Sequence, residues 1–115
     1  MIETSEALST AHDKTPAILS LIGDTPLVEI TQFDAGPCQL FLKLENQNPG
    51  GSIKDRIALS MIEAAEAEGK LEPGGTVIEA TAGNTGLGLA LVAGAKGYRV
   101  LLVIPDKIRR KRYRM

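Results

Sequence analysis

Lys54 is the first residue whose type and place in the sequence could support chemistry. It follows the loop Asn-Pro-Gly-Gly-Ser-Ile (48–53) and is predicted to be the second residue of a helix. Free N–H groups and the dipole at a helix start disfavour a cation there, which favours a neutral amine in a desolvated cleft. Schiff-base chemistry requires such an amine. The alternative is a solvated lysine that faces Asp55 or Glu45.

The segment Thr81-Ala82-Gly83-Asn84-Thr85 is the second candidate. A glycine-containing loop that enters a helix presents backbone N–H groups to an anion, and the helix dipole assists. Thr81 and Thr85 add hydroxyl groups, and the Asn84 amide can donate to a phenolic or carboxylate oxygen. This composition is compatible with anion binding. The alternative is that Gly83 only permits a turn and Thr85 caps the helix.

A dinucleotide-binding unit is a rival interpretation of the same loop, because Asp106 follows it by about twenty residues. The glycines are Gly83, Gly86 and Gly88, which gives G-x-x-G-x-G. The fingerprint requires G-x-G-x-x-G, so the spacing is reversed and argues against this class of site.

Alternating strand and helix patterns surround the two loops. Period-two alternation of leucines predicts a strand at 39–45, and helical spacing with Ser52 as cap and Asp55 completing a capping box predicts a helix over 52–68. The further predicted elements are a helical turn at 16–21, strands at 27–30 and 76–80, a helix at 85–95 and a strand at 99–104. The last is a continuous apolar run, as in strands buried on both faces. The order predicts an open α/β layer with a parallel sheet and crossover helices.

Composition excludes several classes of protein. The 115 residues fit one domain, and a single cysteine and a single histidine exclude a disulfide scaffold and a structural zinc site. Four aromatic residues argue against a stacking platform for nucleic acid. The start of the chain has no apolar signal region, and the longest apolar stretch is too short for a membrane span. The default expectation is a reduced, cytoplasmic protein with no membrane partner.

Charge divides the chain unevenly. Residues 1–106 hold fourteen acids and seven bases, a net −7, whereas residues 107–115 hold six bases and no acid. We expect residues 1–15 to be a flexible arm, residues 16–106 the folded part, and residues 107–115 a basic tail. The acidic body would oppose binding of nucleic acid through this tail.

Four segments together resemble the cysteine synthase/cystathionine β-synthase family, the pyridoxal-phosphate enzymes of fold type II. They are Ile-Gly-Asp-Thr-Pro-Leu (22–27), Lys-Leu-Glu (43–45), Asn-Pro-Gly-Gly-Ser-Ile-Lys-Asp-Arg (48–56) and Glu-Ala-Thr-Ala-Gly-Asn-Thr-Gly-Leu-Gly-Leu-Ala (79–90). The resemblance covers about residues 16–107. It implies an incomplete three-layer open parallel α/β sheet, with pyridoxal 5'-phosphate as cofactor and an amino acid as substrate.

The resemblance also implies roles for individual residues. Lys54 matches the lysine that holds pyridoxal phosphate and later moves the Cα proton, and Asn84 matches the asparagine that bonds the phenolic oxygen of the cofactor. Thr81, Gly83, Asn84 and Thr85 match the loop that binds the substrate carboxylate. The implied reaction is β-replacement, from L-serine or O-acetyl-L-serine and a thiol or sulfide to cystathionine or cysteine. The resemblance also implies a homodimer for the full-length members. Asp55 and Arg56 are interpreted as structural residues that brace the helix start.

Two departures from the family pattern limit what the chain is expected to do alone. Ala82 stands where many members have serine, which affects a carboxylate contact. The later stretch that cradles the cofactor phosphate has no counterpart in the 115 residues. The basic segment 107–115 is interpreted as outside the pattern: a sign of truncation, a polyanion-binding patch or a solvated helix end. The leading hypothesis is therefore a truncated β-replacement enzyme that is inactive in isolation; the alternative is a non-catalytic α/β binding or interaction module.

Overall fold

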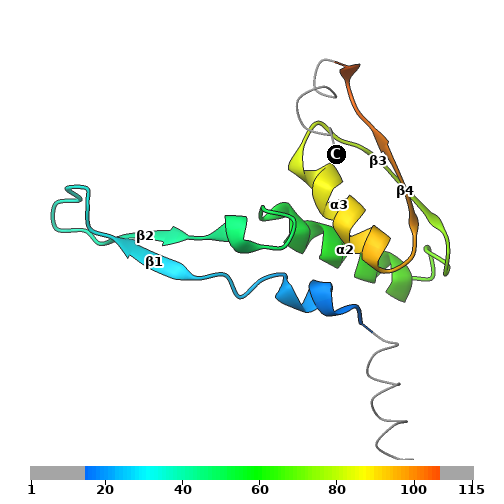
Figure 1. Cartoon of the computed structure of the whole chain (residues 1–115), viewed down its shortest axis with the longest axis horizontal. Coiled ribbons are helices and arrows are strands. Elements are labelled where there is room, and N and C mark those ends of the chain that lie inside the picture. The colour runs from blue at the N-terminus through cyan, green and yellow to red at the C-terminus, as the bar shows by residue number, and fades with distance from the viewer. Residues whose placement is uncertain (1–14, 107–115) are drawn as a thin grey trace, which may run out of the picture.

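A computed structural model describes residues 15–106 of the chain (Figure 1). The predicted arm, apart from residue 15, and the basic tail 107–115 lie outside the described residues. The elements in chain order are the 3₁₀ helix η1 (Ala17–Leu21), strands β1 (Leu27–Ile30) and β2 (Leu40–Lys43), the 3₁₀ helix η2 (Glu45–Gln47), helix α2 (Lys54–Ala67), strand β3 (Thr76–Ala80), helix α3 (Asn84–Ala95) and strand β4 (Arg99–Val103).

The parallel pair β3–β4 and the two α-helices form the body of the structure. Thr76 pairs with Arg99 and Ala80 with Val103, so the two strands end at the same edge, and α3 connects them as a crossover. Helix α3 packs against the sheet on one side and against α2 on the other. Buried residues of the two helices and η1 form the core: Leu19, Ala58, Ile62, Leu89, Val92 and Ala93. This arrangement confirms the predicted strand–helix–strand unit from 76 to 103.

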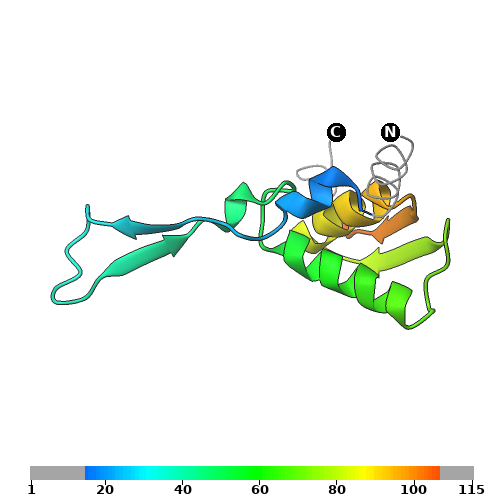
Figure 2. The same cartoon turned by 90° about the horizontal axis from the view of Figure 1, so that it is seen from below.

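The first two strands do not join that sheet. β1 and β2 form an antiparallel hairpin, in which Val28 faces Leu42 and Ile30 faces Leu40. The hairpin extends away from the helices in both views (Figures 1 and 2). The prediction that strand 39–45 belongs to the parallel sheet is therefore wrong. Residues 31–39 connect β1 and β2 directly, and so short a connection suits an antiparallel pair, so β2 pairs with β1.

One face of the β3–β4 sheet is open to solvent. Val77 and Val100 point toward the helices and pack on the core. On the opposite face, Ile78, Leu101 and Val103 are 62%, 54% and 56% exposed. The prediction that strand 99–104 is buried on both faces is wrong for the described residues, because α3 packs against one face of this sheet and the side chains of the other face are exposed. The apolar run follows the parallel-sheet pattern, but only half of it is covered.

Polar contacts fasten the far end of α2 to the turn between α3 and β4. Glu66 accepts hydrogen bonds from Lys96 Nζ at 2.7 Å and from the Tyr98 hydroxyl at 2.6 Å. The Lys96 contact, followed by that of Tyr98, lowers the pKa of Glu66, and the carboxylate in turn raises the pKa of Tyr98. These contacts fix the two helices at the end opposite to the two chemistry-bearing loops. None of the helices in residues 15–106 has the length and apolar character needed to cross a membrane.

Candidate functional site

The starts of α2 and α3 lie against each other, and Gly88 makes this approach possible. A Cβ atom at Gly88 would lie 2.7 Å from the carbonyl oxygen of Lys54 and 3.2 Å from the backbone nitrogen of Asp55. Only glycine admits such a close backbone approach without displacement. The packing therefore brings the Lys54 loop and the Thr81–Thr85 loop to the same end of the helix pair.

Lys54 is the first residue of α2 and is half-buried. Its backbone N–H donates to Ser52 Oγ at 3.1 Å. The N-cap position is Ile53, without a side-chain cap, so the predicted cap at Ser52 is wrong and the helix starts two residues later than predicted. The ion pairs of the described chain are Arg56–Glu45, Lys70–Glu68 and Lys96–Glu66. Across residues 15–106 the Lys54 amine thus has no ion-pair partner. The structure pairs Lys54 with neither Asp55 nor Glu45 in these residues, and the alternative of a solvated lysine stays open beside the Schiff-base interpretation.

Asp55 does not complete a capping box with Ser52. Its buried carboxylate instead accepts the N–H of Gly50 through Oδ2 at 2.5 Å. A Cβ atom at Gly50 would lie 2.3 Å from the other carboxylate oxygen, so this loop position must be glycine for the contact to form. The structural interpretation of Asp55 is confirmed, although its partner is the loop and not the cap.

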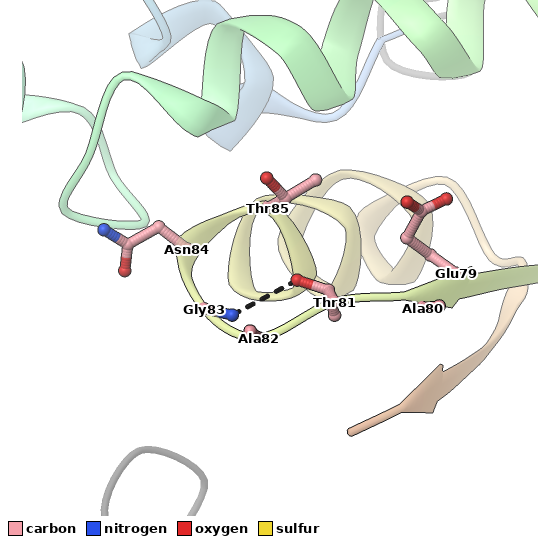
Figure 3. Close-up of a pocket in the computed structure, with 7 residues that line it drawn as sticks. All are labelled: Glu79, Ala80, Thr81, Ala82, Gly83, Asn84 and Thr85. Atoms are coloured by element: carbon pink, nitrogen blue, oxygen red, sulfur yellow. Dashed lines mark hydrogen bonds between the residues drawn. The ribbon is translucent and has the colours of Figure 1, made fainter. Parts of the chain in front are cut away.

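Thr81 precedes α3, and its side chain holds the first turn of that helix by hydrogen bonds. It is buried, and its Oγ1 accepts the N–H of Gly83 at 3.3 Å (Figure 3). The same Oγ1 accepts the N–H of Gly86 at 3.1 Å. The capping role suggested for Thr85 therefore belongs to Thr81. The Thr81 side chain points into the helix turn, whereas Asn84 and Thr85 point outward from it. Thr81 sets the direction of the loop, and the two outward side chains are placed for a ligand.

An open hollow of about 580 Å³ lies in front of this turn, lined by residues 79–85. All four predicted substrate-binding residues, Thr81, Gly83, Asn84 and Thr85, line it. A second hollow of about 430 Å³ shares Ala80, Thr81 and Ala82 and continues along the end of β4. Lys54 is not part of either lining, so the structure places the lysine at the same end of the helix pair without bringing its side chain into the hollow.

Three of the four segments that suggested the family meet in one polar cluster. Glu45 accepts Arg56 Nε at 2.5 Å and the Thr25 hydroxyl at 2.5 Å. Asn48 donates to the Glu45 carbonyl oxygen at 2.8 Å and accepts the Gly23 N–H at 2.8 Å. Arg56 also donates to Thr25 at 3.2 Å. The cluster ties the segment before β1, η2 and the first turn of α2 together, which confirms the bracing role of Arg56.

The sequence interpretation gives no role to Thr25, Glu45, Asn48 or Gly88, although all four stand in the quoted segments. The signal that was missed is the presence of charged, amide and hydroxyl side chains within short segments that lack any apolar periodicity. Such residues satisfy one another in the fold. For Gly88, the signal is its place one helical turn after Asn84, where a missing side chain permits helix contact.

Arg56, and after it Thr25, lowers the pKa of Glu45, while the carboxylate raises the pKa of Arg56. A glutamate whose pKa is lower in the folded chain stabilises the fold above its unfolded pKa and loses that effect as the pH falls through the folded value. We expect Glu45→Gln to lower the urea midpoint at pH 7 and the deficit to shrink between about pH 5 and pH 3. Glu63→Gln, at an exposed site of α2, is the control. A deficit that is constant across this range would contradict the prediction.

The arrangement is that of an α/β protein in which a lysine stands at the start of one helix. The loop Thr81–Thr85, whose composition suits an anion, stands at the start of the adjacent helix. The sequence profile of the family described as "Pyridoxal-phosphate dependent enzyme" matches residues 18–115. The chain therefore belongs to the pyridoxal-phosphate-dependent enzyme family. The matched span includes residues 107–115, so it gives no support to a family boundary at residue 106.

Individual relatives agree with this assignment. Cysteine synthase of Staphylococcus aureus is 51% identical over 96 residues, which are 83% of this chain and 31% of the relative. Cystathionine beta-synthase of Oryctolagus cuniculus is 51% identical over 105 residues, 89% of this chain and 19% of the relative. The chain thus spans less than a third of the length of these curated relatives. The resemblance to the cysteine synthase/cystathionine β-synthase family is confirmed.

Solved structures confirm the fold class. A hydrogen sulfide-producing enzyme from Fusobacterium nucleatum superposes with a TM-score of 0.78 at 46% identity, covering 84% of this chain and 32% of that one. An O-acetylserine dependent cystathionine beta-synthase from Helicobacter pylori gives 0.73 at 38% identity, over 82% and 32%. The described residues are therefore an α/β part, with a parallel sheet, of the fold-type-II pyridoxal-phosphate enzymes.

The residues present fit pyridoxal phosphate as the cofactor of the family. The cofactor offers an aldehyde, a phenolic oxygen and a phosphate. Lys54 supplies an amine without an ion-pair partner in residues 15–106, and Asn84 supplies an amide that points outward from α3. The first N–H groups of α3, which have no partner within the helix, favour an anion at the same place.

Proposed function

We propose that this chain supplies the lysine and the carboxylate-binding loop of a β-replacement enzyme, with L-serine or O-acetyl-L-serine as the donor and a thiol or sulfide as the acceptor. The observation that carries the proposal is the contact of Gly88 with the Lys54 carbonyl group, which sets the Lys54 loop beside the Thr81–Thr85 loop. The proposal includes a homodimer and a cytoplasmic location for the assembled enzyme; the homodimer rests on the resemblance, and the location rests on the composition of the chain.

Each residue has a task in this reaction. The N–H groups at the start of α3 and the Thr85 hydroxyl hold the substrate carboxylate, and Thr81 keeps that turn in shape. The Asn84 amide donates to the phenolic oxygen of the cofactor. Lys54 holds the cofactor through its amine and then moves the proton at Cα. When bound, the cofactor supplies an electron sink in its pyridine ring.

The bonds balance without an oxidant or a reductant. The Cα–H and Cβ–O bonds of the donor break, and the oxygen leaves as acetate or, after taking a proton, as water. A Cβ–S bond forms as the thiol loses its proton, and a proton returns to Cα from Lys54. Both donors share a carboxylate and an oxygen at Cβ, so the described loop serves either of them.

The isolated 115-residue chain is not expected to catalyse this reaction. The hollow at residues 79–85 is open, and the chain spans 31% of the S. aureus cysteine synthase. Water has free access to such a site, which weakens every electrostatic contact in it. We therefore expect no stable visible absorbance when the chain is mixed with pyridoxal phosphate, and no turnover of L-serine with homocysteine.

A chimera tests the function itself. Residues 18–106 of this chain replace the matching residues of the S. aureus cysteine synthase, and the product is assayed with O-acetyl-L-serine and sulfide and with L-serine and homocysteine. We expect turnover with at least one pair. A folded chimera that binds pyridoxal phosphate but replaces no β-substituent would refute the proposed function. It would favour the non-catalytic module instead. Turnover by the isolated chain would refute only its predicted inactivity.

A further inference from the structure

Asp55 is a buried carboxylate whose hydrogen bonding is incomplete. The residue is 0% exposed, and its Oδ2 accepts the Gly50 N–H at 2.5 Å. Its Oδ1 has no hydrogen-bond partner in the described part of the chain. A buried polar atom without a partner destabilises the fold, and more so when the group is charged. The fold thus keeps a costly group directly beside Lys54.

The contacts around Asp55 fix the backbone on both sides of Lys54. Before the lysine, the carboxylate holds Gly50, where an added Cβ would lie 2.3 Å from Oδ1. At the lysine, Ser52 Oγ accepts the backbone N–H, and Gly88 packs on the carbonyl oxygen. The Asp55 contact is the one among these that determines the path of the loop before the helix.

A carboxylate suits this place for a further reason. It lies in the first turn of α2, where negative charge interacts favourably with the helix dipole. The positive end of α2 is therefore occupied by a group of the chain itself. The first turn of α3, in contrast, contains no acidic residue. Its polar side chains line the hollow.

We infer that Asp55 is a positioning residue that holds the loop 48–53 so that the Lys54 amine is presented to the cofactor aldehyde at the start of α3. The inference rests on the proposed function for what Lys54 meets. It goes beyond a bracing role, because it predicts a change in Lys54 chemistry in a chain that is still folded.

The test traps the lysine reaction in the 115-residue chain. Pyridoxal phosphate and cyanoborohydride are added, and mass spectrometry gives the ratio of labelled Lys54 to labelled Lys70. Lys70 is an exposed lysine in the same molecule and serves as the internal reference. Trapping records transient encounters that leave no stable absorbance. We expect Lys54 to be preferred and Asp55→Asn to reduce the ratio about tenfold or more, because a misplacement of ~1 Å costs up to about 100-fold.

Two further variants make the result decisive. Asp34→Asn is the matched control, because Asp34 Oδ1 also accepts a glycine N–H, that of Gly36 at 2.9 Å, in the turn of the hairpin. We expect it to leave the ratio unchanged. Gly50→Ala disturbs the same contact from the other side and leaves the carboxylate in place, and we expect it to reduce the ratio as Asp55→Asn does.

The outcomes separate the two proposals. A merely structural Asp55 would lower the urea midpoint while the labelling ratio of the folded chain stays the same, and that result overturns the inference alone. The inference is also overturned if neither Asp55→Asn nor Gly50→Ala gives a folded chain by circular dichroism. If the unmodified chain shows no preference for Lys54 over Lys70, the proposed function fails together with the inference.

Discussion

Lys54→Ala should lower the kcat/KM of the chimera with the S. aureus cysteine synthase by about 1,000-fold or more, because proton transfer by a positioned side chain contributes 10²–10⁴-fold. The residue also holds the cofactor in the proposed reaction, so its loss removes two functions at once. Its amine has no ion-pair partner in residues 15–106, and therefore no carboxylate of the described chain should lose a partner when the amine is removed.

Steady-state rates with O-acetyl-L-serine and sulfide measure the effect, and borohydride fixation followed by peptide mapping shows whether the cofactor is attached at residue 54. Lys70→Ala is the control, since Lys70 is exposed beyond the end of α2 and pairs only with Glu68 in the described part. Less than a tenfold loss in a folded Lys54→Ala chimera would remove Lys54 from the reaction.

Gly88→Ala should destabilise the chain by about 1–3 kcal/mol, the usual cost of overpacking. The new Cβ would lie 2.7 Å from the Lys54 carbonyl oxygen, and backbone atoms on both sides leave no flexible group to yield. Helix α2 must then move away from α3. We expect a lower urea midpoint and a lower ratio of labelled Lys54 to Lys70, because the displacement separates the lysine loop from the start of α3.

Gly94→Ala in the same helix should have the opposite sign. Nothing lies within 4 Å of a Cβ atom at Gly94, and the position is exposed. Glycine in a helix interior costs about 0.5–1 kcal/mol relative to alanine, so we expect a small gain in stability. If Gly88→Ala stabilises the chain as Gly94→Ala does, the helix contact at Lys54 is not close and the site geometry proposed above is incorrect.

The body of the fold follows closely from local patterns. The strand predicted at 76–80 is β3 with the same bounds, and the helix predicted at 85–95 begins only one residue earlier as α3. Turn glycines and apolar periodicity act within a few residues, so the sequence itself carries this information. The same local patterns place the two candidate loops just before helices. The predicted residues of the second loop line one hollow, in agreement with that placement.

Strand pairing and side-chain hydrogen bonds were beyond the reach of those patterns. The pairing of β2 with β1 and not with the parallel sheet depends on hairpin formation by residues 27–43. The cap of α3 comes from Thr81, five residues before the N–H of Gly86 that it accepts. The cluster of Glu45 with Thr25 and Arg56 joins residues 20 and 31 positions apart. Each depends on three-dimensional packing that no local periodicity encodes.

The hairpin has a consequence for handling the chain at high concentration. On one face of β1–β2, Val28, Leu40 and Leu42 are 44%, 42% and 47% exposed, and Phe33 in the connecting turn is 69% exposed. Two-stranded ribbons with free edges recruit further strands, and here no helix of the described residues shields them. This ribbon should therefore set the solubility limit of the purified chain. We expect Leu42→Lys to raise the protein concentration at which light scattering shows aggregation.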